Sequence, residues 1–121
     1  MWLFTTVGFF SIVRKPGTAY LTVRARARGD LENLRARYLA DLSPSFALPA
    51  SDYPWRATVT HEAFARAAAA MVMDVTYDNF KDQVRKTQGS ARAHAYHDVW
   101  AAVGNLKDGN PLPGTEREGS R

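Results

Sequence analysis

The chain has 121 residues, of which 45% are apolar and 23% are charged, and this composition fits one globular domain with a substantial core. It contains no cysteine, so a disulfide scaffold, a thiolate metal site and a cysteine nucleophile are excluded. The net charge is +4, and residues 1–37 alone hold seven Lys or Arg against two acidic residues. This concentration of positive charge favours an anionic partner.

The first segment, residues 2–13, is rich in aromatic and β-branched residues and predicts a buried strand. Gly8 interrupts the segment, as a bulge or a close approach of two backbones would. The charges of Arg14 and Lys15 follow the apolar run, which is the reverse of a signal peptide. The run is also shorter than the ~20 residues of a membrane span. We therefore expect a cytoplasmic protein with no membrane partner.

Residues 19–28 show the clearest strand pattern, and a Pro16-Gly17 turn signal precedes them. Their side chains alternate strictly, so apolar and polar residues are predicted to lie on opposite sides of a strand. The apolar side carries Leu21 and Val23, and should face the core. The polar side carries Tyr20, Thr22, Arg24, Arg26 and Arg28. This strand and the preceding one are predicted to form a hairpin.

Capping residues and helical spacing predict the middle of the chain. Asp30 is expected to cap a helix over about 31–41. A Pro/Ser loop at 43–52 leads to an alternating strand at 53–59, whose Pro54 suits the edge of a sheet. Thr60 is expected to cap a helix over about 61–74.

Two more helices are predicted, over about 78–86 and about 91–106, with Ser90 as the cap of the second. The second helix is expected to bury one stripe of side chains, made of Ala93, Tyr96, Trp100 and Val103. Residues 107–121 carry almost nothing apolar and predict a disordered tail that adds nothing to stability. The domain organisation expected is therefore a single α+β domain over 1–106 with that tail.

Together these elements predict an α+β fold in the order ββαβααα. The simplest arrangement is a three-stranded antiparallel sheet whose strands, numbered along the chain, lie in the order 2-1-3. The most continuously apolar strand, residues 2–13, would then lie in the middle, and the helices would cover one face. Such an arrangement is partly ferredoxin-like, which by itself implies no function.

Four short motifs give the chain a resemblance to a family of small bacterial proteins of unknown function. They are WLFTTVGFFSIV at the start, YPWRATV in the third predicted strand, YDNFK in the third helix and YHDVW in the fourth. The resemblance covers residues 1–106. It implies no activity, ligand or catalytic residue, so the functional interpretation depends on the residues themselves.

The arginines of residues 19–28 are the sharpest functional feature. Arg24, Arg26 and Arg28 would lie about 7 Å apart on one strand face, close to the phosphate spacing of a nucleic-acid strand. Guanidinium groups bind phosphates bidentately. A solvated face that is kept charged against edge pairing is the alternative, and a salt-bridged dimer is a third. The candidate ligand-binding residues are Lys15, Tyr20, Arg24, Arg26, Arg28 and Arg56.

Two polar clusters are candidate chemical sites. His94, His97 and Asp98 share a helix face, and could bind a metal ion only if another segment supplied a further ligand. A partly buried histidine with a local partner is the commoner arrangement, and Asp98 would be the partner of His94. Aspartates also recur every four residues at Asp74, Asp78 and Asp82, where helix capping and other local roles are expected. We predict no metal, no cofactor and no catalytic residue.

Two classes of function remain open. The first is a non-enzymatic binding module whose basic sheet face holds nucleic acid or another polyanion. The second is a protein-interaction or homo-oligomeric module that uses the same face or an edge strand. A steep salt dependence of binding would distinguish them, because the release of condensed counterions is specific to polyanions.

Overall fold

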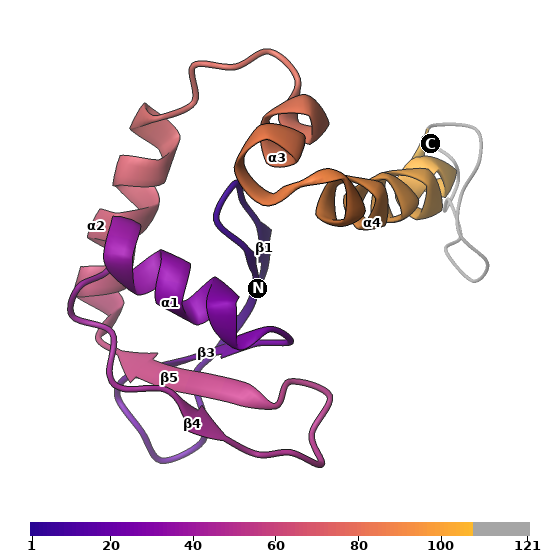
Figure 1. Cartoon of the computed structure of the whole chain (residues 1–121). Helices are drawn as coiled ribbons and strands as arrows, with labels where there is room; N and C mark the ends of the chain where they lie inside the picture. Colours follow the sequence, from indigo (N-terminus) through magenta and orange to yellow (C-terminus); the bar gives the residue numbers. More distant parts are fainter. Residues whose placement is uncertain (108–121) are drawn as a thin grey trace, which may run out of the picture. The chain divides into compact units, whose positions relative to one another are not determined.

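A computed structural model of the chain describes residues 1–107 (Figure 1). Within these residues the fold is α+β, with a five-stranded antiparallel sheet and four α-helices. The strands are β1 (Trp2–Phe4), β2 (Phe9–Val13), β3 (Leu21–Ala25), β4 (Phe46–Ala47) and β5 (Trp55–Val59). The helices are α1 (Arg28–Arg37), α2 (His61–Met73), α3 (Phe80–Gln88) and α4 (Ser90–Ala102), and a 3-10 helix, Val103–Leu106, follows α4.

The chain divides into two compact units, the first of which is Met1–Phe80 and the second of which begins at Lys81. The first unit holds the sheet, α1 and α2, and the second holds nearly all of α3 together with α4. The single domain over 1–106 stays a prediction. The predicted tail at 107–121 lies outside the described residues, apart from Lys107.

The strands of the sheet lie in the order β1-β2-β3-β5-β4, so the predicted order 2-1-3 is wrong. The segment 2–13 is two strands rather than one. Thr5 breaks it, because its hydroxyl accepts hydrogen bonds from the backbone N–H of Val7 and Gly8 and donates to the Gly8 carbonyl. The resulting hairpin places β1 on the outer edge of β2, and β5 therefore pairs with β3. The central strand is β3.

The space beside Gly8 is filled by the side chain of Asp30 rather than by another backbone, and a side chain on residue 8 would clash with it. Asp30 is only 5% exposed, and its carboxylate accepts a hydrogen bond from the backbone N–H of Phe9 at 3.0 Å. It therefore does not cap α1 as predicted. The helix begins at Arg28 after Ala27, and the Asp30 side chain joins the helix to the sheet instead.

One face of the sheet forms the core of the first unit. Alternate residues of β2, β3 and β5 pack there against α1 and α2, which lie on the same side of the sheet (Figure 1). The predicted cap of α2 is confirmed, since the Thr60 hydroxyl accepts from the backbone N–H of Ala63 at 3.1 Å. The core residues include Phe10, Ile12, Val23, Leu31, Leu34, Ala57, Val59, Phe64 and Ala67.

In the second unit, the predicted stripe of α4 is only half correct. Ala93 and Tyr96 are buried, but Trp100 is 62% exposed and Val103 is also exposed. The Trp100 ring lies 5.2 Å from the His97 ring and 4.6 Å from the Lys81 ammonium group. The indole thus stacks on polar neighbours at the surface rather than in a core. Gly89, with a φ of 93°, occupies the N-cap position predicted for Ser90.

Candidate nucleic-acid interface

A row of residues crosses the outer face of the sheet, opposite the core, with one member from each strand. Paired positions across antiparallel strands point to the same side of a sheet. The pairing register links Trp2 to Ser11, Ser11 to Arg24, Arg24 to Arg56, and Arg56 to Phe46. Two aromatic residues therefore stand at the ends of a row that has two arginines near its middle.

Arg24 is held flat against this face. Its terminal nitrogen donates to the Ser11 hydroxyl at 2.6 Å, and its guanidinium carbon lies 4.6 Å from the centre of the Tyr53 ring. Ser11 and Tyr53 are both buried. Within residues 1–107, the buried Nε–H of Arg24 has no acceptor. The side chain is thus fixed in place while its charge is incompletely satisfied.

Arg26 shares the same aromatic ring. Its guanidinium carbon lies 5.0 Å from the centre of the Tyr53 ring, and its side chain is exposed. Cation–π contacts of this kind orient an arginine without neutralising its charge. Tyr53, which lies in the segment between β4 and β5, therefore brings Arg24 and Arg26 together.

Arg56 is the third arginine of this surface. Its terminal nitrogen donates to the Ser51 hydroxyl at 2.8 Å, and its Nε donates to the Tyr53 carbonyl at 3.3 Å. These bonds hold the loop that presents the Tyr53 ring. We call the surface formed by Arg24, Arg26, Arg56 and Tyr53 the arginine face.

Arg28, Lys15 and Tyr20 are not brought to the arginine face. Strand β3 ends at Ala25, so Arg28 is the first residue of α1, where it stacks on Trp55 at 5.4 Å and lies 3.9 Å from Glu32. Lys15 and Tyr20 lie in the connection between β2 and β3. Among residues 1–107, no hydrogen bond or ring contact joins either of them to Arg24, Arg26 or Arg56.

The arginine face carries positive charge without paired acids. In the described part of the chain, the four ion pairs within 4 Å involve other arginines and leave Arg24, Arg26 and Arg56 without a carboxylate. Like charges that face each other across strands destabilise a sheet, and Arg24 and Arg56 occupy such a pair of positions. The surface is therefore suited to an anion.

An aromatic cluster lies beside the arginines. Phe4 stacks on Phe9 with ring centres 4.4 Å apart, and Trp2 meets Phe9 edge-on at 5.9 Å. The Phe9 ring lies 6.3 Å from that of Tyr53, which carries the arginines. The aromatic residues of 2–13 are visible in the sequence. Their pairing in a hairpin was not predicted, because two strands with a turn between them have the same pattern as one apolar run.

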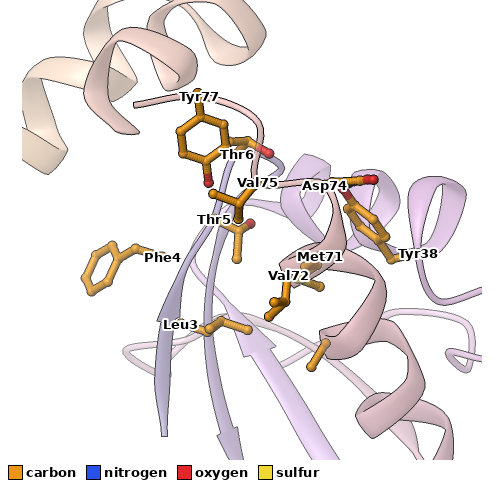
Figure 2. Close-up of a pocket in the computed structure, with 11 residues that line it drawn as sticks. Leu3, Phe4, Thr5, Thr6, Tyr38, Met71, Val72, Asp74, Val75 and Tyr77 are labelled. Atoms are coloured by element: carbon orange, nitrogen blue, oxygen red, sulfur yellow. Dashed lines mark hydrogen bonds between the residues drawn. The ribbon is translucent and has the colours of Figure 1, made fainter. Parts of the chain in front are cut away.

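A pocket of about 210 Å³ lies elsewhere in the first unit, between β1 and the end of α2 (Figure 2). Its wall is mostly apolar, with Leu3, Met71 and Val72 on two sides. At its polar end the Tyr38 hydroxyl donates to the Asp74 carboxylate at 2.6 Å. Burial, followed by this bond to Asp74, raises the pKa of Tyr38. The carboxylate is thus already engaged, and the arrangement provides no activated nucleophile.

The polar clusters considered from the sequence have local contacts. His97 Nδ1 lies 2.9 Å from the Lys81 ammonium group, and no ion pair joins His94 to Asp98 within the described residues. In residues 1–107, no group of three or more His, Asp or Glu side chains is placed to hold a metal ion. Asp74 bonds Tyr38, and Asp82 pairs with Arg85 at 2.7 Å.

No helix within residues 1–107 has the length and apolar character needed to cross a bilayer. No protein-family model, curated protein or solved structure matches the chain. The resemblance to small bacterial proteins therefore stays a prediction, and the geometry of the arginine face is the basis for a functional proposal.

Proposed function

We propose that this protein is a non-enzymatic binding module that holds nucleic acid or another polyanion on its arginine face. The observation that carries the proposal is that Arg24 and Arg26 stack on the Tyr53 ring and Arg56 bonds the Tyr53 carbonyl, with no carboxylate among residues 1–107 to neutralise the three. A bound phosphate chain would relieve their mutual repulsion. It would also form charge-assisted bonds, which are stronger than bonds between neutral groups.

The rigidity of the face supports this proposal. Arg24 is bonded to Ser11 and stacked on Tyr53, and Arg56 is bonded to the loop beside it. Little side-chain freedom is therefore left to lose when a ligand binds, and this lowers the entropic cost of binding. Arg26, which is exposed, supplies the group that a ligand reaches first.

The test is a titration of labelled single-stranded and duplex oligonucleotides between about 50 and 200 mM salt, where contacts with several phosphates lower affinity steeply. Arg24→Ala/Arg26→Ala should weaken binding at low salt and flatten the dependence of log K on log salt by about one to two phosphate contacts. The matched control is Arg66→Ala on α2, on the opposite side of the sheet, which should leave both quantities unchanged. Absence of binding at low salt, or full binding by the double variant, would refute the proposal.

A protein-interaction or homo-oligomeric module is the second candidate. It is favoured by three exposed apolar side chains, Val72 and Met73 in the last turn of α2 and Val75 just after it. Exposed apolar patches mark interaction sites more often than chance predicts. Sedimentation at two protein concentrations tests it: a mass that rises with concentration, and is insensitive to Arg24→Ala/Arg26→Ala, would favour this candidate.

A further inference from the structure

Resting on the proposed function, we infer that the polyanion is single-stranded nucleic acid, with bases stacked on Trp2 and Phe46. These two residues are the ends of the row across the outer face. Trp2 and Phe46 are 65% and 44% exposed, so a ligand on the outer face can reach them. Sequence-tolerant binding of single strands combines such rings with a basic groove.

The spacing of the row fits a short length of nucleic acid. Five neighbouring strands at about 4.8 Å place Trp2 and Phe46 roughly 19 Å apart. At roughly 6–7 Å per nucleotide of an extended strand, this distance holds about three nucleotide intervals. Arg24 and Arg56 lie between the two rings, so phosphates can meet guanidinium groups while bases at either end meet aromatic faces.

Trp2 is held in a defined orientation. Its ring packs edge-on against Phe9, which is itself stacked on Phe4. The two rings are perpendicular, so Phe9 can cover at most one face of the indole and leaves the other for a base. Tyr53, in contrast, is 7% exposed and lies under two guanidinium groups, so it cannot accept a base. Bases of the ligand therefore stack on Trp2 and Phe46, at the ends of the row.

This arrangement distinguishes a single strand from a duplex. In a duplex each base is stacked between its neighbours, so a side chain must unstack a step before it can reach a base face. Unpaired bases present free faces to aromatic side chains at no such cost. Phosphates are present in both ligands, and the arginines alone would not separate them.

The experiment compares three ligands of the same length, about 12 nucleotides, which lies within the site sizes of single-strand binders. They are oligothymidylate, the corresponding sugar–phosphate chain without bases, and a duplex. Fluorescence anisotropy gives the affinity of each for the full chain. Oligothymidylate should bind about tenfold more tightly than the baseless chain.

The decisive variants are Trp2→Leu and Phe46→Leu. Each should weaken oligothymidylate binding by about fivefold or more, with an unchanged salt dependence and unchanged binding of the baseless chain. Trp2→Phe retains a stacking ring and should keep most of the affinity. Trp100→Leu, an exposed tryptophan in the second unit, is the matched control and should have no effect.

Three failures can be told apart. If all three ligands bind equally and Arg24→Ala/Arg26→Ala weakens each of them, the proposed polyanion function stands and base stacking is wrong. If none of them binds at low salt, both are wrong. If Trp2→Leu weakens binding of the baseless chain as much as of oligothymidylate, the effect is structural and base stacking is again overturned.

Discussion

A Cβ built on Gly8 would lie 2.6 Å from the Cβ of Asp30, which is closer than two side chains can approach. Asp30 is itself fixed by its bond to the Phe9 backbone. Gly8→Ala must therefore displace the Asp30 side chain, which connects α1 to the sheet. We expect a loss of about 1–3 kcal/mol in the free energy of unfolding. The midpoint of urea unfolding measures this loss.

Gly29→Ala is the control, because residue 29 lies within α1 and nothing occupies the space around its Cβ. That substitution should stabilise the protein by about 0.5–1 kcal/mol, since alanine favours a helix more than glycine does. Equal effects of the two substitutions would contradict the close approach at Gly8.

The bond between Ser11 and Arg24 predicts a strong non-additive effect. Ser11→Ala leaves a guanidinium nitrogen without its acceptor, and Arg24→Met leaves a buried hydroxyl without its donor. Each single change should cost about 1–3 kcal/mol. The double variant Ser11→Ala/Arg24→Met should cost less than the sum, because the shared hydrogen bond is lost only once and neither partner is left unpaired. A double-mutant cycle with an interaction energy near zero would contradict this coupling.

The bond between Tyr38 and Asp74 predicts a pH dependence. Burial and this bond raise the pKa of Tyr38 above its ordinary value of 10.0. The folded state therefore retains the phenolic proton more firmly than the unfolded chain does. The stabilisation is complete below pH 10.0 and is lost as the pH rises through the raised pKa.

Tyr38→Phe should remove this contribution, so its difference in unfolding midpoint from the parent should shrink between about pH 8 and about pH 11. Tyr20→Phe alters an exposed tyrosine and serves as the control. A difference that is constant with pH would show that the bond to Asp74 does not depend on the phenolic proton.

Trp100→Ala should have little effect on stability. The sequence pattern placed this residue in a core, where its loss would cost roughly 3–5 kcal/mol. Its exposure limits the expected cost to below about 1 kcal/mol, as for other surface positions. Phe10→Ala, at a fully buried position of β2, should instead show the full core cost in the same urea titration. A large loss at Trp100 would mean that its ring is buried.

Local patterns predicted the elements that depend on local chemistry. Strict alternation found β3, and Thr60 marked the start of α2. The pairing of strands failed because it depended on Thr5, whose hydroxyl closes a turn inside an apolar run. Hydrophobic periodicity does not register a single side chain that bonds to the backbone. The prediction therefore had one strand where the structure has β1 and β2, lacked β4, and placed the strands in the wrong order.

The candidate site was predictable only in part, because local sequence patterns do not show which distant segments come into contact. Alternation placed Arg24 and Arg26 together, but their common partner Tyr53 lies 27 residues or more along the chain. Phe46 came from a loop without strand pattern, and pairing with Arg56 made it part of the sheet. Contacts between distant segments decided which aromatic residues joined the arginines.

Both edges of the sheet end in very short strands, three residues in β1 and two in β4. A strand this short offers few free N–H and C=O groups, so it is a poor template for another chain to extend the sheet. The described part of the protein is thereby protected against growth into β-linked polymers. Any partner that binds it tightly should approach a face and be recognised by side chains rather than by the backbone.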